Sequence, residues 1–343
     1  MEEAVPEALW ATVEHDHAPG PDPSLLTRMR KGQNPAKFVN AVSRPQRITA
    51  AVLSYIPVLS GFYAETLDVL KVCLSSIAED AGLPFDLMVF DNGSCTEVRE
   101  FLLGERESGR IQYLVLSEKN VGKGGAWNVI LGGAPGEIIA YSDSDVLFSP
   151  NWLKRSVELL DGFPNVGMVT ARPFRTPPDL FASTLAWARQ QASLEAGSFI
   201  PWETFLEFNL SLGQSEEENR AVFADTRDWR IAYKGLTAFA GASHWQFVGH
   251  KSTLQRFLPF AMDKPMGEVR QLDRRVDEAG LLRLMLPDPL AMNLSNTLGR
   301  GRGELNRPQK RTPKPLGKRL LEVGPIKKVL LALHNKIFRW YYT

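Results

Sequence analysis

Short apolar runs alternate along this chain with longer segments in which apolar residues recur at helical spacing. Runs of this length that end in Gly, Asn or Asp are typical of buried strands, and the spacing i, i+3, i+4 is typical of helices with one buried face. The predicted strands begin at Ile48, Phe85, Ile111 and Ile138, and the predicted helices lie near 64–81 and 152–160. This alternation predicts an α/β fold with a mostly parallel sheet flanked by helices.

The strand that begins at Ile138 ends in two carboxylates, Asp143 and Asp145, separated by Ser144. Side chains alternate faces along a strand, so both carboxylates are expected on one side. Hard divalent cations such as Mg²⁺ or Mn²⁺ bind one or two carboxylates together with substrate phosphates, which makes the pair a candidate metal site with Asp145 as the direct ligand. Two solvated loop aspartates are the alternative.

A second acidic turn, Asp91-Asn92-Gly93-Ser94, follows the strand that begins at Phe85. Ligands of open α/β sheets gather at the carboxyl ends of the strands, so both acidic turns are expected to share one crevice. The same four residue types are also common in ordinary turns that bind no ligand. Position after an apolar strand favours the site interpretation.

A glycine-rich stretch, residues 120–128, lies between the two acidic turns and opens a predicted helix. Its glycines are expected to let a ligand approach the backbone closely, and Lys123 is expected either to meet a phosphate or to remain a solvated loop lysine.

With these motifs in order, the chain resembles a family 2 glycosyltransferase of the GT-A type. The resemblance covers roughly residues 47–175 and is looser over 267–268 and 272–280. It implies that Asp143 contacts the nucleotide ribose, the metal or its waters, and that Asp91 recognises the base or ribose. The other residues that it places at a nucleotide-sugar donor are Ser54, Tyr55, Asn120, Gly122, Lys123, Gly124, Asn128 and Ser144.

The catalytic base departs from the family pattern. The family commonly has a Glu-Asp pair followed by an Arg and a Gly, and Arg275 and Gly280 fit the later positions, which puts Val269 where the Asp is expected. Glu268 and Asp273 remain as candidate bases, and either is alternatively a charged residue on a helix surface. The family's later metal-binding His is also missing from residues 292–296.

Composition bounds the organisation of the chain. With 343 residues and 44% hydrophobic content, one catalytic domain with appendages is expected: an N-terminal arm at 1–46, a GT-A domain at 47–298 and a basic extension at 299–343. Within the domain, 47–175 is the predicted donor half and 176–298 the acceptor half. Two cysteines make no disulfide framework, and Cys73 is expected in the core. The start of the chain is unlike a secretory signal, no apolar run is long enough to span a bilayer, and a cytoplasmic protein is expected.

The extension is strongly basic. From Arg300 to Thr343 there are twelve Lys or Arg against Glu304 and Glu322, so it carries +10 while the rest of the chain carries about −9. Helical spacing of apolar residues near its end predicts an amphipathic helix. This helix is expected either to lie on an anionic membrane surface, making the protein peripheral, or to pack on the catalytic domain or a second subunit. No nucleic-acid recognition module is present, and no nucleic-acid partner is expected.

The acceptor half is rich in aromatic residues between about 182 and 245. These rings either form an acceptor groove, because sugar C–H faces stack on aromatic rings, or belong to the core. His244 and His250 are interpreted as structural histidines.

The resulting hypothesis is a GT-A glycosyltransferase that moves a sugar, with inversion and metal assistance, from a UDP-, GDP- or dTDP-sugar to a hydroxyl acceptor, either a saccharide or a lipid-linked one. The alternatives are a sugar-nucleotide nucleotidyltransferase and a degenerate GT-A domain that serves as a binding module. A nucleotidyltransferase is disfavoured because this chain has no glycine-rich, basic nucleotide-binding loop near the first strand. A degenerate binding module is disfavoured because Asp143 and Asp145 are retained.

Overall fold

The structure is a computed structural model that describes residues 32–39, 42–262 and 270–299. The chain divides into two compact units, Met1–Arg44 and Pro45–Thr343. In the first unit the described residues form one short 3₁₀ helix, η1 (Pro35–Phe38), which is capped by the side chain of Asn34. Glu268 and the predicted C-terminal amphipathic helix lie outside the described residues.

The second unit is built on a ten-stranded sheet with the order β3-β2-β1-β4-β10-β6-β11-β9-β8-β7. The strands are β1 (Ile48–Ser54), β2 (Asp86–Asn92), β3 (Tyr113–Ser117), β4 (Ile138–Asp143), β6 (Val166–Thr170), β7 (Ser193–Gly197), β8 (Asp228–Tyr233), β9 (Leu236–Ala240), β10 (Gln246–His250) and β11 (Leu282–Met285). A separate two-stranded sheet pairs β5 (Val146–Phe148) with β12 (Ala291–Asn293).

The predicted α/β architecture with a mainly parallel sheet is confirmed, although the sheet is mixed. Strands β3, β2, β1 and β4 are all parallel, and β6 and β11 are parallel to each other. Strand β10 is antiparallel to both β4 and β6, and β9, β8 and β7 extend the far side as an antiparallel meander. The regular parallel half therefore comes first in the chain, and the antiparallel strands come from the later half.

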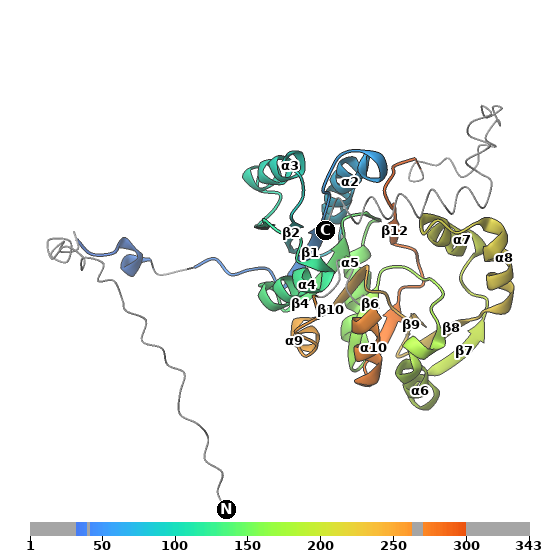
Figure 1. Ribbon diagram of the computed structural model, residues 1–343. Helices are drawn as coiled ribbons and strands as arrows, with labels where there is room; N and C mark the ends of the chain where they lie inside the picture. The colour runs from blue at the N-terminus through green and yellow to red at the C-terminus, as the bar shows by residue number, and fades with distance from the viewer. Residues whose placement is uncertain (1–31, 40–41, 263–269, 300–343) are drawn as a thin grey trace, which may run out of the picture. The chain divides into compact units, whose positions relative to one another are not determined.

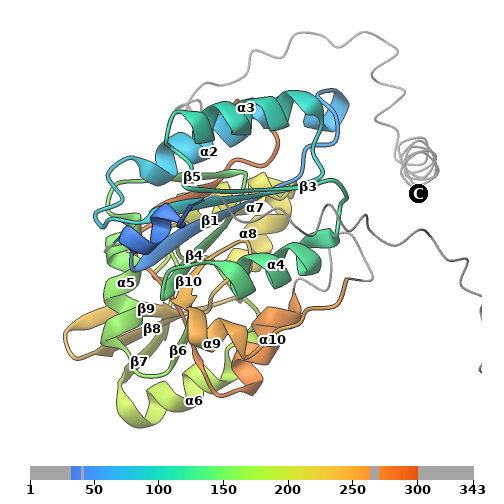
Figure 2. The ribbon, with the colours of Figure 1, turned by 90° about the vertical axis from the view of Figure 1, so that its left-hand side faces the viewer.

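Helices cover both faces of the sheet (Figures 1 and 2). They are α2 (Thr66–Ala78), α3 (Thr96–Glu107), α4 (Gly122–Gly133), α5 (Trp152–Gly162), α6 (Ala182–Gln191), α7 (Trp202–Ser211), α8 (Glu216–Asp225), α9 (Lys251–Gln255) and α10 (Arg270–Glu278), with short 3₁₀ turns η2 (Gly61–Tyr63) and η3 (Pro178–Leu180). In Figure 2, α2 and α3 lie on one side of β1 to β3 and α4 lies on the other.

The hydrophobic core forms two clusters separated by the sheet. All seven residues of β1 are buried. Ala50 and Val52 belong to the cluster that includes α2 and α5, whereas Ala51 and Leu53 belong to the cluster that includes α4, α9 and α10. A strand buried on both faces reads as a continuous apolar run, because both sets of alternating side chains need an apolar partner. Cys73, fully buried in the first cluster, confirms the prediction of a core cysteine.

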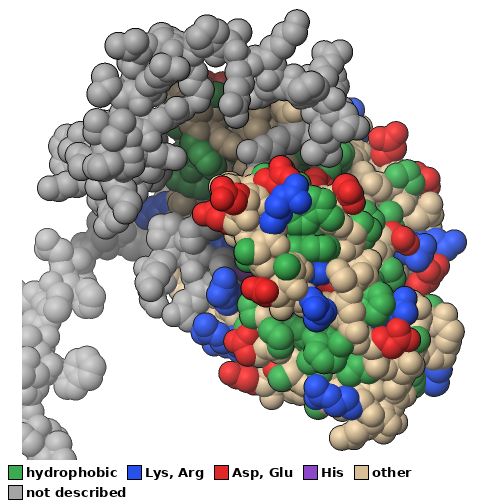
Figure 3. Space-filling model, turned by 90° about the vertical axis from the view of Figure 1, so that its right-hand side faces the viewer, with side chains coloured by type: hydrophobic (Ala, Val, Ile, Leu, Met, Phe, Trp, Pro, Cys, Tyr) green, Lys and Arg blue, Asp and Glu red, His purple; other side chains and the backbone are tan. Residues whose placement is uncertain are grey.

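No helix within 32–39, 42–262 and 270–299 is long and apolar enough to cross a membrane. The face turned toward the viewer in Figure 3 carries acidic and basic side chains interspersed with apolar ones over its described part.

Candidate functional site

The candidate site lies where three adjacent parallel strands end. Strand register places Ser54, the last residue of β1, beside Asp91 of β2. On the other side of β1, Leu53 pairs with Asp143, the last residue of β4. The two acidic turns predicted to share a crevice are thus separated by a single strand, and Tyr55 follows directly after it.

Polar atoms at this edge are buried without a partner among the described residues. They are Ser54 Oγ, Asp91 Oδ1 and Asp145 Oδ1. A buried polar group that makes no hydrogen bond costs about 1–3 kcal/mol, and more if it is charged, so such groups are rare unless a ligand satisfies them. Three on neighbouring strand ends indicate a site for a polar ligand.

Asp91 is fully buried, and one of its oxygens is engaged locally. Its Oδ2 accepts a hydrogen bond from the backbone N–H of Ser94 at 3.1 Å. Burial raises the pKa of Asp91, and the hydrogen bonds from Ser94 oppose that rise only in part. The carboxylate is therefore held in place with Oδ1 remaining to accept a hydrogen bond from a ligand.

Asp143 is held by two side chains, one from α4 and one from its own strand β4. Lys123 Nζ lies 2.7 Å from both carboxylate oxygens of Asp143, and the Tyr141 hydroxyl donates to Asp143 Oδ1 at 2.6 Å. Burial, followed by the negative charge of Asp143, raises the pKa of Tyr141 well above its usual range, so the hydroxyl remains a donor. The side chain of Lys123 is buried and ion-paired, so it is not a solvated loop lysine. Its contact with a phosphate stays a prediction.

The Asp145 side chain has no such partner among the described residues. Burial, followed by the negative charge of Asp143, raises its pKa to about 7, and the charge of Lys123 acts in the opposite direction. Its backbone carbonyl accepts from Leu294 N at 2.7 Å, which fixes the turn next to the β5–β12 pair. Ser144, half-buried, lies in the same turn.

The residues at this edge fit a divalent cation. Within the described residues no group of three or more His, Cys, Asp or Glu could hold a metal ion. Mg²⁺ and Mn²⁺ need only one or two carboxylates when phosphate oxygens and waters complete the shell. Asp145, with its unpaired buried oxygen, suits the role of ligand, and Asp143 is close enough to raise the pKa of Asp145 but is engaged by Lys123.

The glycine-rich turn is held by an amide network. Asn92 Nδ2 donates to Asn120 Oδ1 at 2.9 Å, and Asn92 Oδ1 accepts from Val121 N at 2.9 Å. Asn120 Oδ1 also accepts from Gly122 N at 2.8 Å, and Gly122 has a φ of +72°, which only glycine adopts readily. Asn120 and Gly122 therefore set the backbone at the start of α4.

Gly124 and Asn128 are approached closely by the backbone of residues 260–261. A Cβ atom on Gly124 would collide with the carbonyl oxygen of Ala261. Asn128 donates to Phe260 O at 3.0 Å and accepts from Phe260 N at 2.7 Å. These two predicted donor contacts thus fix residues 260–261 against α4.

Asp273 is buried and both of its oxygens are engaged. Arg283 donates to Oδ1 at 2.6 Å, and His244 Nδ1 lies 2.7 Å from Oδ2. Sequence reasoning named Asp273 as a candidate base but interpreted His244 as structural. No sequence signal marked His244, because its position two residues before β10 acquires meaning only through the pairing of β10 with β4. His250 lies at the other end of the same strand, 3.8 Å from Asp161.

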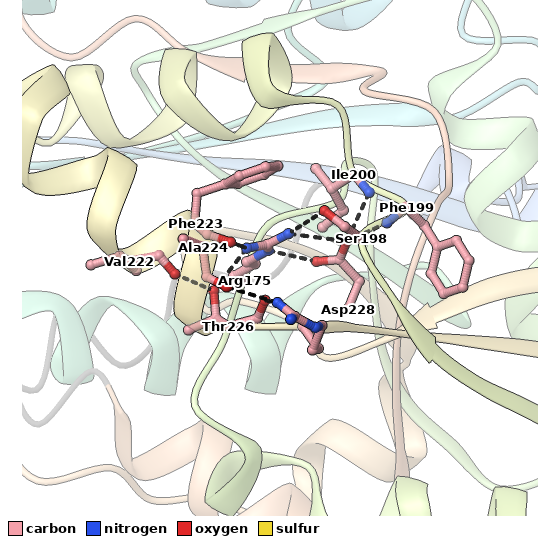
Figure 4. A network of polar contacts seen from close by, with 10 residues as sticks. Arg175, Ser198, Phe199, Ile200, Val222, Phe223, Ala224, Thr226 and Asp228 are labelled. Carbon is pink, nitrogen blue, oxygen red and sulfur yellow. Dashed lines mark hydrogen bonds and ion pairs between the residues drawn. The ribbon is translucent and has the colours of Figure 1, made fainter.

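The half of the chain predicted to bind the acceptor contains a second buried polar cluster around Arg175 and Asp228 (Figure 4). Arg175 Nε donates to Asp228 Oδ1 at 2.7 Å, and its guanidinium also donates to Phe223 O, Thr226 Oγ1 and Ser198 Oγ. The aromatic rings predicted as either groove or core include buried Phe205, Phe208 and Trp245, which belong to the core cluster.

Comparison with known proteins gives a family match over part of the chain. Residues 58–205 match the family model for glycosyl transferase family 2. An uncharacterized glycosyltransferase of Nostoc sp. (strain PCC 7120 / SAG 25.82 / UTEX 2576) is 26% identical over 100 residues, which are 29% of this chain and 31% of that protein. The chain thus spans under a third of the curated relative.

Two solved structures are similar at low identity. A mannosyltransferase from Pyrobaculum calidifontis in complex with GDP-Man and Mn²⁺ is 18% identical, with a TM-score of 0.46 over 75% of this chain and 59% of that one. TarS from S. aureus in complex with UDP-GlcNAc is 14% identical, with a TM-score of 0.43 over 71% of this chain and 56% of that one.

Proposed function

This chain carries a glycosyl transferase family 2 domain over residues 58–205, and from that premise we propose that it transfers a sugar from a nucleoside diphosphate donor to a hydroxyl acceptor with inversion. The observation that carries the proposal is the set of unpaired buried atoms Ser54 Oγ, Asp91 Oδ1 and Asp145 Oδ1 at adjacent strand ends. A sugar nucleotide offers base, ribose and diphosphate groups in a row, and this order suits a row of polar strand ends.

Each residue at the edge has a separate task in this proposal. Asp91 and Ser54 bind the nucleoside, because a carboxylate accepts and a hydroxyl donates or accepts hydrogen bonds with ribose and base. Asp145 is the metal ligand. Asp143, neutralised by Lys123, contacts the ribose or waters. Tyr55, Ser144 and the turn held by Asn120 and Gly122 border the donor.

A divalent cation, when bound, supplies positive charge to the diphosphate leaving group. UDP-, GDP- and dTDP-sugars all meet the chemistry of the edge. The proton of the acceptor hydroxyl goes either to Glu268 or to the hydrogen-bonded pair of Asp273 and His244. Attack by the acceptor oxygen on the face opposite the leaving group inverts the anomeric carbon.

The basic extension is proposed to hold the protein at an anionic membrane surface. A Lys or Arg near such a surface contributes about 1 kcal/mol, and salt weakens the attraction. Salt-sensitive co-sedimentation with phosphatidylserine vesicles, lost on truncation at Pro325, is the expected result. Insolubility of the truncated protein, with no vesicle binding by the whole chain, would assign the helix to a core or subunit contact.

The experiment that tests the function is a donor panel. UDP-, GDP- and dTDP-sugars are incubated with Mn²⁺ and simple glycoside acceptors, and release of the nucleoside diphosphate and sugar transfer are measured. Turnover of one nucleotide class supports the proposal. Consumption of a nucleoside triphosphate and sugar phosphate with release of pyrophosphate indicates a nucleotidyltransferase instead, and nucleotide binding without turnover indicates a binding module.

A further inference from the structure

His244 lies at the same edge of the sheet as the two aspartates of the donor site. It lies in a tight turn between Ser243 and Gln246, two residues before β10 begins. Because β10 runs antiparallel to β4, the start of β10 meets the end of β4. The carbonyl of the next residue, Trp245, accepts a hydrogen bond from Asp143 N at 2.8 Å, so the backbone next to His244 is fixed to the end of β4.

The hydrogen bond to Asp273 sets the state of the imidazole ring. A carboxylate can only accept a hydrogen bond, so His244 Nδ1, 2.7 Å from Asp273 Oδ2, carries the proton. In a neutral imidazole the lone pair then lies on Nε2, which makes no hydrogen bond with any described residue. This arrangement of carboxylate and imidazole leaves one ring nitrogen ready to accept a proton.

Asp273 is in turn fixed by a buried arginine. Arg283 donates to Asp273 Oδ1 at 2.6 Å and to the carbonyl of Ala242 at 2.5 Å, and it also donates to the carbonyl of Leu180. Arg283 is fully buried, and burial lowers its pKa while the charge of Asp273 opposes that shift. The cation thus orients the carboxylate.

Asp273 and His244 differ in solvent exposure. The Asp273 side chain is 4% exposed, whereas that of His244 is 22% exposed. A proton acceptor must come within about 2.6–3.2 Å of the hydroxyl that it deprotonates. Both Asp273 oxygens are engaged, so an acceptor hydroxyl can reach this pair only at His244.

We propose that His244 is the general base of sugar transfer and that Asp273 is the positioning residue that orients it. The inference rests on the proposed function. The acceptor O–H proton moves to His244 Nε2, and the oxygen lone pair forms the new bond to the anomeric carbon. The electron pair of the old bond leaves with the nucleoside diphosphate. The imidazolium that results is stabilised by Asp273.

The test uses the full chain with the donor and acceptor that the wild-type protein turns over. His244→Gln is expected to lower kcat by about 10²-fold or more. Affinity for the matching nucleoside diphosphate, measured by calorimetry with Mn²⁺, is expected to change by less than about twofold, because the base acts on the acceptor. His250→Gln is the matched control, since it changes the same residue type at the opposite end of β10 from His244, and it should keep wild-type kcat.

Two further variants separate chemistry from structure. Addition of imidazole to His244→Ala is expected to restore part of the lost turnover, which a structural role would not allow. Asp273→Asn is expected to lower kcat with nucleotide affinity retained, and thermal unfolding checks its fold.

If the wild-type protein turns over a donor and His244→Gln has nearly the same kcat, this inference is wrong while the proposed function stands. The inference is also wrong if Glu268→Gln abolishes transfer and His244→Gln retains it. Absence of any donor turnover by the wild-type protein overturns the proposed function and this inference with it.

Discussion

Two regions of the molecule contain buried carboxylates, and they differ in whether those carboxylates have hydrogen-bonding and charged partners. At the donor edge, Asp91 and Asp145 each keep one buried oxygen without a partner among the described residues. In the acceptor half, Asp228 accepts from Arg175 and from the backbone N–H groups of Phe199 and Ile200 at 2.6 and 2.8 Å (Figure 4). Both side chains of that ion pair are at most 5% exposed.

The difference separates a structural role from a binding role. A buried charge is tolerated when opposite charge and hydrogen bonds compensate its lost hydration, as at Asp228. A buried carboxylate without such compensation reduces stability. It is expected where a bound ligand supplies the missing hydrogen bonds or positive charge. Removing a carboxylate should therefore cost stability in the acceptor half and activity at the donor edge.

The largest effect is expected at the paired site. Asp228→Ala leaves the Arg175 guanidinium buried without its counter-charge and should lower the free energy of unfolding by about 3–5 kcal/mol. Chemical denaturation measures the change. Asp225→Ala, at an exposed carboxylate three residues earlier, is the control and should be near wild type. Equal stability of both variants would contradict the structural role of the Arg175–Asp228 pair.

Asp145→Ala tests the opposite case. Turnover should fall by at least about 10²-fold, equivalent to about 2.7 kcal/mol, because a charge-stabilising group is lost. The free energy of unfolding should stay the same or rise, since an unpaired buried carboxylate has been removed. Asp68→Asn on the surface of α2 serves as the control.

Chelation gives an independent check on the same residue. Excess EDTA should abolish turnover in the wild-type protein, and Mn²⁺ should restore it. Undiminished activity in EDTA, or in Asp145→Ala, would remove the metal assignment.

A smaller effect is expected at Asp91. Asp91→Asn keeps the shape but weakens one charge-assisted hydrogen bond, so nucleotide affinity should fall about tenfold, or about 1.4 kcal/mol. Asp86→Asn is the matched control, because Asp86 begins the same strand at the opposite edge. Calorimetric titration with the nucleoside diphosphate distinguishes them, and equal affinities would place the nucleoside elsewhere.

The smallest effect is expected at an exposed ion pair. Glu216 and Arg220 are about half to two-thirds exposed and one helical turn apart on α8. Because solvent screens such pairs, Glu216→Gln should change stability by no more than ~0.5 kcal/mol. A larger loss in denaturation would mean that burial is not what separates the strong pairs from the weak ones.

The regular donor half could be predicted closely from the sequence. The strand expected at 48–55 is β1 (Ile48–Ser54), and the helix expected near 64–81 is α2 (Thr66–Ala78). Apolar period and chain breakers determine such elements locally, and their parallel order places Asp91 and Asp143 near each other without further information.

Partners that depend on distant chain segments could not be predicted. His244 and Asp273 are 29 residues apart, and Asp273 meets Arg283 only because α10 packs on β11. The pairing of Lys123 with Asp143 likewise depends on how α4 lies against β4. Sequence spacing does not determine these distances, so the ion pair of Lys123 with Asp143 could not be predicted.

The position of β10 in the sheet has a consequence for synthesis of the chain. Residues 246–250 are made late, yet they fill the place between β4 and β6, which are complete by residue 170. A nascent chain that has reached only residue 205 therefore leaves two interior strands with open hydrogen-bonding edges. Open edges of this kind pair readily with other chains, and long-range strand pairing slows folding. A fragment that holds only the family-matched residues 58–205 is accordingly expected to aggregate, and folding of this chain has to wait for its second half.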